Sequence, residues 1–234
     1  MRDLARRRPA LAQLRYAERR DAFAGLTLAE RFALIHRTNL WGAAETTSGL
    51  GSELAATAAL RAGLHDLLGR YGVRRLLDLP CGEFGWMAAV DLNGVDYIGG
   101  DIVPDIVTAN RARHAAPGVA FRHLDLLEDD LPQADLVLCR DCLVHLSFAN
   151  IHRALENLRA SSARYLLTTT FPELPENGEI EDGDWRPLNL QVAPFCCPPP
   201  LEILLENCTE AGGDYRDKAL ALWRLEDLRE PGRL

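Results

Sequence analysis

The sequence predicts an α/β domain with a doubly wound, mostly parallel sheet, helices on both faces of that sheet, and an N-terminal helical extension. Two observations favour this fold. Short apolar runs alternate with helical patterns over residues 74–171, which is typical of a mostly parallel sheet. The first apolar run leads into a glycine-containing turn and the second ends in an acid, which is typical of the opening unit of a doubly wound sheet.

Length, composition and charge limit what the chain can be. It has 234 residues, 47% of them hydrophobic, so it can build one domain with a substantial core. We expect residues 1–52 to form the extension and residues 53–234 to form the domain. The net charge of −8 argues against a general nucleic-acid binder, which needs a basic face.

The charge is unevenly distributed along the chain. Residues 1–20 hold seven arginines against Asp3 and Glu18, which gives this segment a charge of +5. We expect this basic arm to be a solvated helix face. The alternative is a contact with an anionic substrate, a phosphate-rich partner or the acidic body of another subunit.

The first 52 residues are expected to form helices and then a loop. Residues 1–40 carry apolar side chains suited to face inward, namely Leu4, Leu11, Leu14, Phe32, Leu34 and Ile35. Residues 41–52 are small, polar and glycine-rich, which predicts a loop. Ser52 is a candidate N-cap for a helix that reaches Gly69, with Glu53 in its first turn. The apolar stripe of this helix consists of Leu60, Leu64, Leu67 and Leu68.

Strands and helices then alternate. The predicted strands are 75–80, 96–101, 120–125, 134–140 and 164–170, and the predicted helices are 84–90, 104–115 and 148–160. Residues 171–200 hold seven prolines and six acids, which predicts a long loop on the substrate side, since loops of this length are often functional. Residues 201–211 predict a helix. Residues 218–225 predict a closing strand, and we expect its partner within 188–193.

The turn after the first strand indicates which cofactor it suits. Asp101, at the end of the second strand, is suited to bind ribose hydroxyls. The pyrophosphate of a dinucleotide needs backbone N–H groups, but Pro80 has none, and Asp78 and Glu83 add negative charge. S-adenosylmethionine carries no phosphate, and its ammonium suits nearby acids while its carboxylate suits N–H groups of the turn. The sequence therefore favours S-adenosylmethionine over NAD.

Four segments resemble, in order, the motifs of class I S-adenosylmethionine-dependent methyltransferases. They are Asp78-Leu79-Pro80-Cys81-Gly82-Glu83-Phe84-Gly85, Gly99-Gly100-Asp101-Ile102-Val103-Pro104, Phe121-Arg122-His123-Leu124-Asp125 and Leu131-Pro132-Gln133-Ala134-Asp135-Leu136-Val137-Leu138-Cys139-Arg140-Asp141, within a match over residues 74–171. The first motif departs from the family pattern, since only Gly82 keeps its place and Pro80 and Phe84 stand at the other two glycine positions. The resemblance implies methyl transfer on a sheet of the seven-stranded type that ends in an antiparallel hairpin.

The resemblance also assigns cofactor contacts. It places Asp125 and Leu126 beside the adenine, and Arg140 and Asp141 beside the reactive methyl group. The residues expected to bind the cofactor are Asp78, Pro80, Cys81, Gly82, Glu83, Phe84, Gly85, Trp86, Asp101, Ile102, Asp125, Leu126 and Arg140.

Three residues are candidates for catalysis. His145 lies four residues beyond Asp141, so on a helical turn the carboxylate can orient the imidazole as a general base. The alternative is a histidine packed at the start of a helix and bonded to backbone. Arg140 is expected to hold an acceptor carboxylate, which needs no base because it is already ionised near neutral pH, or to pair with an acid of the chain.

Two loops carry candidates for substrate binding. In the family that the motifs resemble, the N-terminal segment commonly folds over the cofactor, so Trp41 and Ser48 can close that side of the site. The alternative is an ordinary connection between helices. Trp185, Arg186 and Asn189 combine an aromatic ring, a cation and an amide, which suits a small polar organic substrate. The alternative for Trp185 is an anchor that fixes the long loop to the domain.

The cysteines and the N-terminus indicate the setting. Cys139-x-x-Cys142 and Cys196-Cys197 have no second well-spaced Cys or His pair, so we expect no metal site and interpret the cysteines as reduced thiols of a cytoplasmic protein. No apolar core follows the N-terminal arginines, and no stretch reaches membrane-spanning length, so we expect neither a signal peptide nor a membrane span.

These observations predict an S-adenosylmethionine-dependent methyltransferase that acts on a small molecule, at the oxygen of a hydroxyl or carboxylate group. Two alternatives stay open. One is a catalytically silent S-adenosylmethionine-binding partner subunit, and the other is an NAD-dependent oxidoreductase. We expect no nucleic-acid or membrane partner, and a homodimer is compatible with the sequence.

Overall fold

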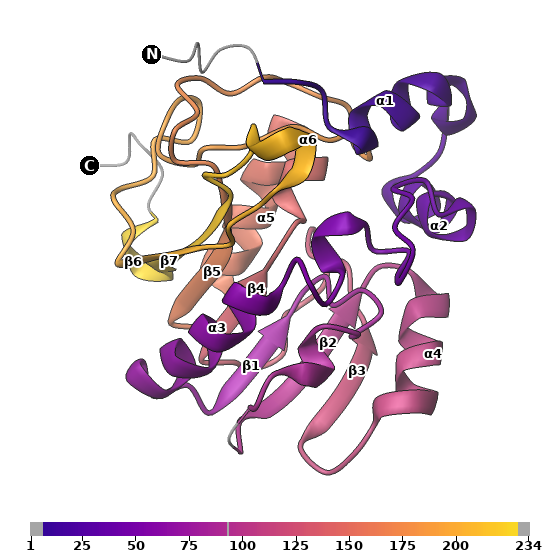
Figure 1. Cartoon of the computed structure of the whole chain (residues 1–234). Coiled ribbons are helices and arrows are strands. Elements are labelled where there is room, and N and C mark those ends of the chain that lie inside the picture. The colour runs from indigo at the N-terminus through magenta and orange to yellow at the C-terminus, as the bar shows by residue number, and fades with distance from the viewer. Residues whose placement is uncertain (1–6, 93, 229–234) are drawn as a thin grey trace.

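A seven-stranded sheet forms the centre of the molecule (Figure 1), and the computed structural model describes residues 7–92 and 94–228. The strand order is β3-β2-β1-β4-β5-β7-β6, in which the first five are parallel neighbours and β7 is antiparallel to both β5 and β6. The strands are β1 Arg75–Asp78, β2 Asp96–Asp101, β3 Val119–His123, β4 Leu136–Cys139, β5 Tyr165–Thr170, β6 Glu202–Leu205 and β7 Ala219–Arg224. The predicted fold class and the predicted hairpin are confirmed.

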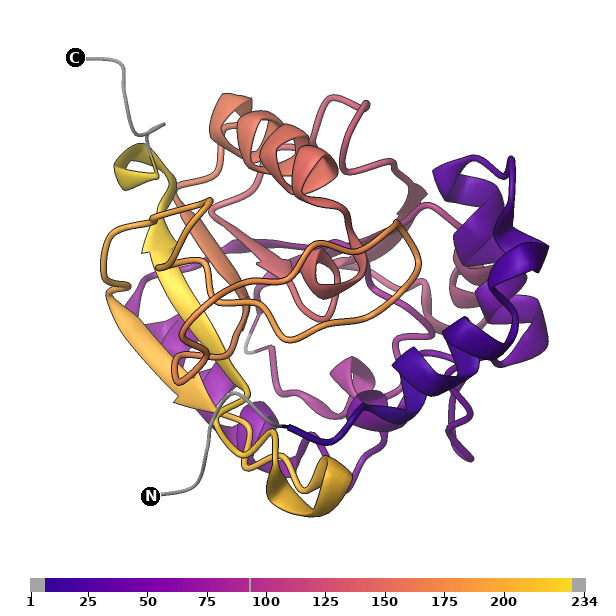
Figure 2. The ribbon, with the colours of Figure 1, turned by 90° about the horizontal axis from the view of Figure 1, so that it is seen from above.

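Helices cover both faces of the sheet (Figures 1 and 2). The α-helices are α1 Leu11–Glu18, α2 Leu28–Thr38, α3 Ala58–Arg70, α4 Pro104–His114, α5 Phe148–Ala160 and the short α6 Glu210–Gly213. The 3-10 turns are η1 Arg20–Phe23, η2 Leu50–Ser52, η3 Met87–Ala89, η4 Leu143–His145 and η5 Leu225–Asp227.

The central strands are buried on both faces, as a parallel sheet requires. Side chains alternate along β1, so Leu76 belongs to the core cluster that contains Leu64 of α3, while Leu77 belongs to the cluster that contains Leu155 of α5. Both leucines of β1 are at most 1% exposed. The two resulting cores fix the strand ends, and those ends position the residues of the motifs.

Two predicted helices, over residues 84–90 and from Ser52, differ from the structure. Residues 84–90 form only the 3-10 turn η3, because Gly82 and Phe84 both have positive φ and keep the turn from winding into a helix. The helix expected from Ser52 begins instead at Ala58. The Glu53 carboxylate accepts the Ala44 N–H rather than lying in a first helical turn.

The helix predicted over 201–211 is wrong, because most of its apolar residues form the edge strand β6. Leu201 donates its N–H to the Leu222 carbonyl and Glu206 donates to the Lys218 carbonyl, so sheet pairing overrides helical propensity here. This strand, and not residues 188–193, is therefore the partner of β7.

The N-terminal extension is helical, but its buried side chains differ from those predicted. Leu11 and Leu14 are 38% and 50% exposed, whereas Tyr16 and Phe23, which were not predicted, are buried and belong to one cluster with Ile35, whose predicted inward position is confirmed. Leu4 lies outside the described residues. In the part of the chain that the structure describes, no helix is both long and apolar enough to cross a membrane.

Three arginines of the basic arm, Arg7, Arg8 and Arg20, pair with acids of their own chain. Arg7 pairs with Asp217 at 2.7 Å and Arg8 pairs with Asp214 at 2.8 Å, which places the N-terminal segment beside α6 (Figure 2). Arg20 also pairs with Glu181. The arm therefore joins the two ends of the described chain.

Candidate active site

The turn after β1 is tied to the end of β2. Cys81 donates its N–H to the Gly100 carbonyl at 2.8 Å, and Gly82 donates to the Asp101 carboxylate at 3.1 Å. Phe84 stands where the family has a glycine, yet it adopts a φ of 62°, in the left-handed region that glycine favours. The turn thus keeps a glycine-like path at Phe84 while the ring packs against Tyr97 and Phe121.

The turn has fewer N–H groups to offer a ligand than the sequence predicted. Those of Cys81 and Gly82 are engaged within the chain, and the Glu83 N–H donates to the Ser48 hydroxyl at 3.4 Å. Among the described residues, the N–H groups of Gly85 and Trp86 make no hydrogen bond. Among the described residues of this turn, the N–H groups left free for a ligand are therefore those of Gly85 and Trp86, which follow the last glycine position of the motif, occupied here by Phe84.

Two buried acids stand at the ends of the central strands. Asp101 accepts the N–H groups of Gly82 and Val103, and burial raises the pKa of its carboxyl to about 6 against the lowering effect of these hydrogen bonds. Asp78 accepts the Tyr97 hydroxyl at 2.7 Å, and burial raises its pKa to about 7. Each carboxylate oxygen has a second lone pair, so Asp101 keeps acceptor capacity for ribose hydroxyls.

The N-terminal loop closes over the turn. The Glu83 carboxylate accepts the hydroxyl of Thr46 at 2.5 Å and the N–H of Thr47 at 2.9 Å. These hydrogen bonds outweigh burial and hold the pKa of Glu83 below its usual range. A Cβ at Gly82 would lie only 2.5 Å from the Ser48 hydroxyl, so glycine is needed where the loop and the turn meet.

A cavity of about 1110 Å³, including space open to solvent, lies beyond the ends of β1, β2 and β4. All thirteen residues expected to bind the cofactor line it. It is also lined by side chains of α2 that sequence reasoning missed, namely Leu28, Phe32, Ile35 and His36. Their only signal was the apolar spacing along a helix, which by itself indicates packing.

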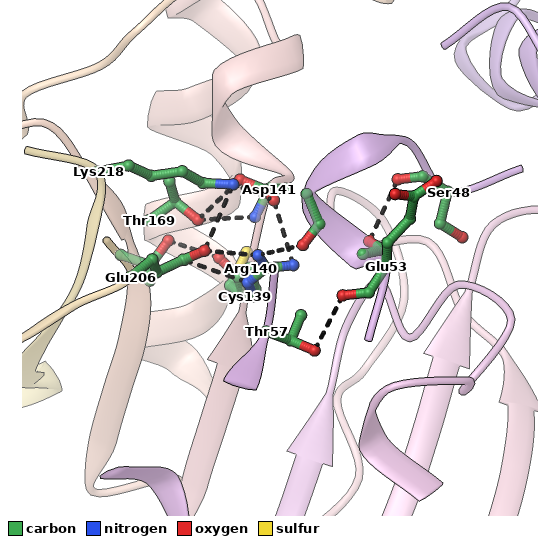
Figure 3. Close-up of polar contacts among 12 residues, drawn as sticks. Ser48, Glu53, Thr57, Cys139, Arg140, Asp141, Thr169, Glu206 and Lys218 are labelled. Atoms are coloured by element: carbon green, nitrogen blue, oxygen red, sulfur yellow. Dashed lines mark hydrogen bonds and ion pairs between the residues drawn. The ribbon is translucent and has the colours of Figure 1, made fainter. Parts of the chain in front are cut away.

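A cluster of four charged side chains lies at the ends of β4, β6 and β7 (Figure 3). The Arg140 guanidinium donates to both carboxylate oxygens of Glu206, at 3.2 and 2.5 Å. Lys218 donates to Asp141 at 2.7 Å and lies 3.5 Å from Glu206. The side chains of Arg140 and Glu206 are only 4% and 3% exposed, so this is a buried network in which two cations match two anions.

The network fixes the charge state of its members. Burial disfavours charge, but Lys218 and Arg140 outweigh it and hold the pKa of Asp141 well below its usual range. Glu206 likewise outweighs burial and raises the pKa of Arg140. Of the two readings of Arg140, pairing with an acid of the chain is the one that the structure supports. Glu206 and Lys218 were missed, although each is a charged residue at the end of an apolar run.

The network also holds the N-terminal segment in place. Arg140 donates to the Gly51 carbonyl of η2 at 2.7 Å (Figure 3), and its guanidinium lies 5.3 Å from the centre of the Trp86 ring. The end of β4 is further fixed because the Asp141 N–H donates to the Thr169 hydroxyl at 2.7 Å. The position of η2 over the sheet therefore depends on Arg140.

A second, smaller cavity adjoins the first, with about 540 Å³ of empty space. The two cavities share Trp41, Ser48 and Asp141 as lining residues. The second is lined by Leu11, Ala12, Trp41, Ser48, Gly49, Leu50, Gly51, Asp141, His145, Phe171, Trp185, Cys208, Glu210, Tyr215 and Lys218. Trp41, Ser48, Trp185, Asp141 and His145 are the candidates that the sequence analysis had singled out.

His145 is oriented by backbone and not by Asp141, which corrects the predicted pair. Its Nδ1 lies 2.8 Å from the Asp184 carbonyl, and its ring stacks on Trp41 with centroids 4.5 Å apart. A carbonyl only accepts, so Nδ1 carries the proton and Nε2 has the lone pair. Burial lowers the pKa of the imidazole to about 4, so it is neutral at neutral pH.

Arg186 and Asn189, predicted to contact a substrate, line neither of the two cavities. Arg186 is buried and donates to the carbonyls of Leu143 and Leu146, each at 2.8 Å. Asn189 donates to the Leu174 carbonyl at 2.9 Å. Both side chains hold the long loop in shape, and Arg186 fixes the turn η4 that carries His145.

The sequence matches no family model and no curated protein. Among solved structures, the 1,6-didemethyltoxoflavin-N1-methyltransferase of Burkholderia thailandensis, with bound 1,6-didemethyltoxoflavin and S-adenosylhomocysteine, aligns with a TM-score of 0.57 and 16% identity over 93% of this chain and 92% of its own. The N-methyltransferase NodS of Bradyrhizobium japonicum WM9, in complex with S-adenosylhomocysteine, aligns with a TM-score of 0.55 and 13% identity. This alignment covers 74% of this chain and 89% of NodS.

PigF with S-adenosylhomocysteine gives a TM-score of 0.58 and 14% identity over 91% of this chain and 68% of its own. At these identities the likeness concerns the arrangement of strands and helices. The order of the seven strands, the turn after β1 and the acid at the end of β2 agree with it. The chain therefore has the fold of the class I S-adenosylmethionine-dependent methyltransferases.

Proposed function

We propose that this protein transfers a methyl group from S-adenosylmethionine, bound in the first cavity, to an oxygen of a small molecule bound in the second. The observation that carries the proposal is that the two cavities meet at Trp41, Ser48 and Asp141. A donor and an acceptor held on either side of this junction are within one enclosure, which favours a displacement that depends on positioning.

The charges of the first cavity support the choice of cofactor. Asp101 suits the ribose hydroxyls, Asp78 suits the ammonium of the methionine part, and Asp125 suits the adenine amine. Arg140, the arginine among the described lining residues of this cavity, is matched by Glu206 and is not free to bind a phosphate. S-adenosylmethionine, when bound, supplies a methyl group attached to a positively charged sulfur.

His145 supports an oxygen acceptor. Nε2 makes no hydrogen bond to the described residues, and it is not among their fully buried polar atoms without a partner, so it has accessible surface. His145 lines only the second cavity. A neutral imidazole there can take the proton of a hydroxyl as the new carbon–oxygen bond forms.

Calorimetric titration with S-adenosylhomocysteine tests the proposal, with NADH as the matched comparison. We expect binding of S-adenosylhomocysteine and none of NADH. A folded protein that does not bind S-adenosylhomocysteine at millimolar concentration contradicts the proposal. Binding without turnover across a wide panel of hydroxyl compounds supports the silent partner subunit instead.

A further inference from the structure

The second cavity has aromatic walls. Trp41, Phe171, Trp185 and Tyr215 line it. The Trp185 ring meets Tyr215 edge to face, with centroids 5.0 Å apart, and meets Phe171 at 6.0 Å. These rings are fixed by one another, so the cavity offers ring surfaces of defined position to whatever enters it. Such surfaces attract organic cations as well as apolar groups.

One charge in this cavity is unmatched. Arg140 and Lys218 balance Asp141 and Glu206, as described above. Glu210, at the start of α6, also lines the cavity. Among the described residues its carboxylate makes no hydrogen bond and no ion pair. Its pKa is raised, chiefly by burial and against the attraction of Lys218, which agrees with a carboxylate that lacks a close partner.

The arginines near the cavity do not supply the missing cation. Arg7, which lies over the Phe171 and Tyr215 rings, is paired with Asp217 at 2.7 Å. Arg8 is paired with Asp214 at 2.8 Å. Lys218 is the cation among the described lining residues, and Asp141 and Glu206 already engage it. Counting the described residues alone, the cavity therefore has an excess of negative charge beside aromatic rings.

We propose that the methyl acceptor carries an ammonium group, which Glu210 and the aromatic walls of the second cavity bind. This inference rests on the proposed function and names the substrate class of that site: a small hydroxyl compound with a basic amine. A carboxylate supplies a charge-assisted hydrogen bond to the ammonium, and the rings add cation–π attraction. The hydroxyl of the same molecule is the group that faces His145.

Three phenols that differ in one substituent test the inference. Tyramine carries an ammonium, 4-ethylphenol is its neutral counterpart, and 3-(4-hydroxyphenyl)propionate carries a carboxylate. Affinities are measured by titration calorimetry on the full chain saturated with S-adenosylhomocysteine. We expect tyramine to bind at least about tenfold more tightly than 4-ethylphenol, and the carboxylate compound to bind most weakly.

Variants assign the preference to Glu210. Glu210→Gln and Glu210→Ala are expected to reduce the advantage of tyramine over 4-ethylphenol to about twofold or less. Glu156→Gln, on the exposed side of α5, is the matched control and should keep the full preference. Melting curves and the affinity for S-adenosylhomocysteine are recorded for each variant, so that loss of folding is recognised.

The outcomes separate this inference from the proposed function. Intact binding of S-adenosylhomocysteine with equal affinities for the three phenols, with tighter binding of the carboxylate compound, or with no binding of tyramine at millimolar concentration overturns the inference alone. A preference for tyramine that survives both Glu210 variants also overturns it. Loss of S-adenosylhomocysteine binding in the unmodified protein contradicts the proposed function.

Discussion

The two cavities are built in different ways. The first is formed largely by the ends of consecutive strands and by the turn after β1, so short stretches of sequence supply most of its walls. The second draws on four separate parts of the chain: the N-terminal segment, η4, the long loop, and the region from Cys208 to Lys218. The difference teaches that one fold can combine a cavity encoded locally, the proposed cofactor site, with a cavity assembled from distant segments, the proposed acceptor site.

The largest expected effect concerns Arg140, which lines the first cavity and pairs with Asp141, a lining residue of both cavities. Arg140→Met leaves Glu206 buried beside Lys218 alone, and breaking a buried pair in this way is expected to cost about 3–5 kcal/mol of the free energy of unfolding. Urea denaturation measures it. Arg153→Met, which breaks the exposed pair with Glu128, is the control and should cost about 1 kcal/mol or less. An equal loss of unfolding free energy in the Arg140 and Arg153 variants would mean that the buried network around Arg140 does not stabilise the protein more than an exposed ion pair does.

A His145 variant tests whether the second cavity serves turnover without contributing to cofactor binding. His145→Ala is expected to lower turnover by about 100-fold or more, because a general base is lost, while the affinity for S-adenosylhomocysteine stays unchanged. Initial rates with an accepted hydroxyl compound and a calorimetric titration measure the two quantities. His152→Ala, at an exposed position of α5, serves as control. Normal turnover in the His145 variant would assign this histidine to packing against Trp41.

Asp101 gives the converse test for the first cavity. Asp101→Asn is expected to weaken S-adenosylhomocysteine binding by about 1.5–3 kcal/mol, since a charged acceptor for the ribose hydroxyls is lost. Calorimetry at pH 8 measures it, and Asp105→Asn, exposed at the start of α4, is the control. An unchanged affinity would show that the acid at the end of β2 does not contact the cofactor.

The affinity for S-adenosylhomocysteine should also depend on pH. Burial raises the pKa of Asp101 to about 6, so the carboxyl is ionised at pH 8 and mostly protonated at pH 5. The ribose hydroxyls donate to ionised Asp101, and the ammonium pairs with ionised Asp78, whose pKa burial raises to about 7. Affinity is therefore full well above pH 7 and falls as the pH drops through 7 and 6, by up to about tenfold per pH unit for each carboxyl. Titrations at several pH values measure this, and the fall should be smaller in Asp101→Asn.

The smallest expected effect is at the loop that covers the first cavity. Thr46→Val removes one hydrogen bond to Glu83 and is expected to weaken S-adenosylhomocysteine binding by about 1 kcal/mol through a looser loop. Thr108→Val, which removes a hydrogen bond within α4, is the matched control. Equal affinities in the two variants would indicate that the loop does not contribute to cofactor binding.

The cofactor half of the molecule was predictable because its signals are local. Short apolar runs indicate the strands β1 to β5. The eight residues 78–85 contain several of the predicted cofactor contacts. The acid Asp101 follows from its place at a strand end, where ligands of such sheets bind.

The acceptor half was not predictable because its contacts join distant residues. Arg140 meets Glu206 across 66 positions, and Lys218 meets Asp141 across 77. Such pairings leave no periodic pattern in the sequence. The sequence therefore predicts a helix where β6 lies, and it assigns no role to Glu210. The polar residues Arg186 and Asn189 are of types that suit a ligand. In the structure they instead donate to backbone carbonyls, because irregular buried backbone needs hydrogen-bond donors.

Joining the first and last parts of the chain has a consequence for biosynthesis. A ribosome delivers Arg140 well before Glu206 and Lys218, so in the growing chain Arg140 has only the neighbouring Asp141 as an acid of the network until the β6–β7 hairpin emerges. Only then can η2 and the arginines near the start of the chain settle against their acids. The lining of the second cavity is therefore complete only after the segment from Cys208 to Lys218 has been synthesised.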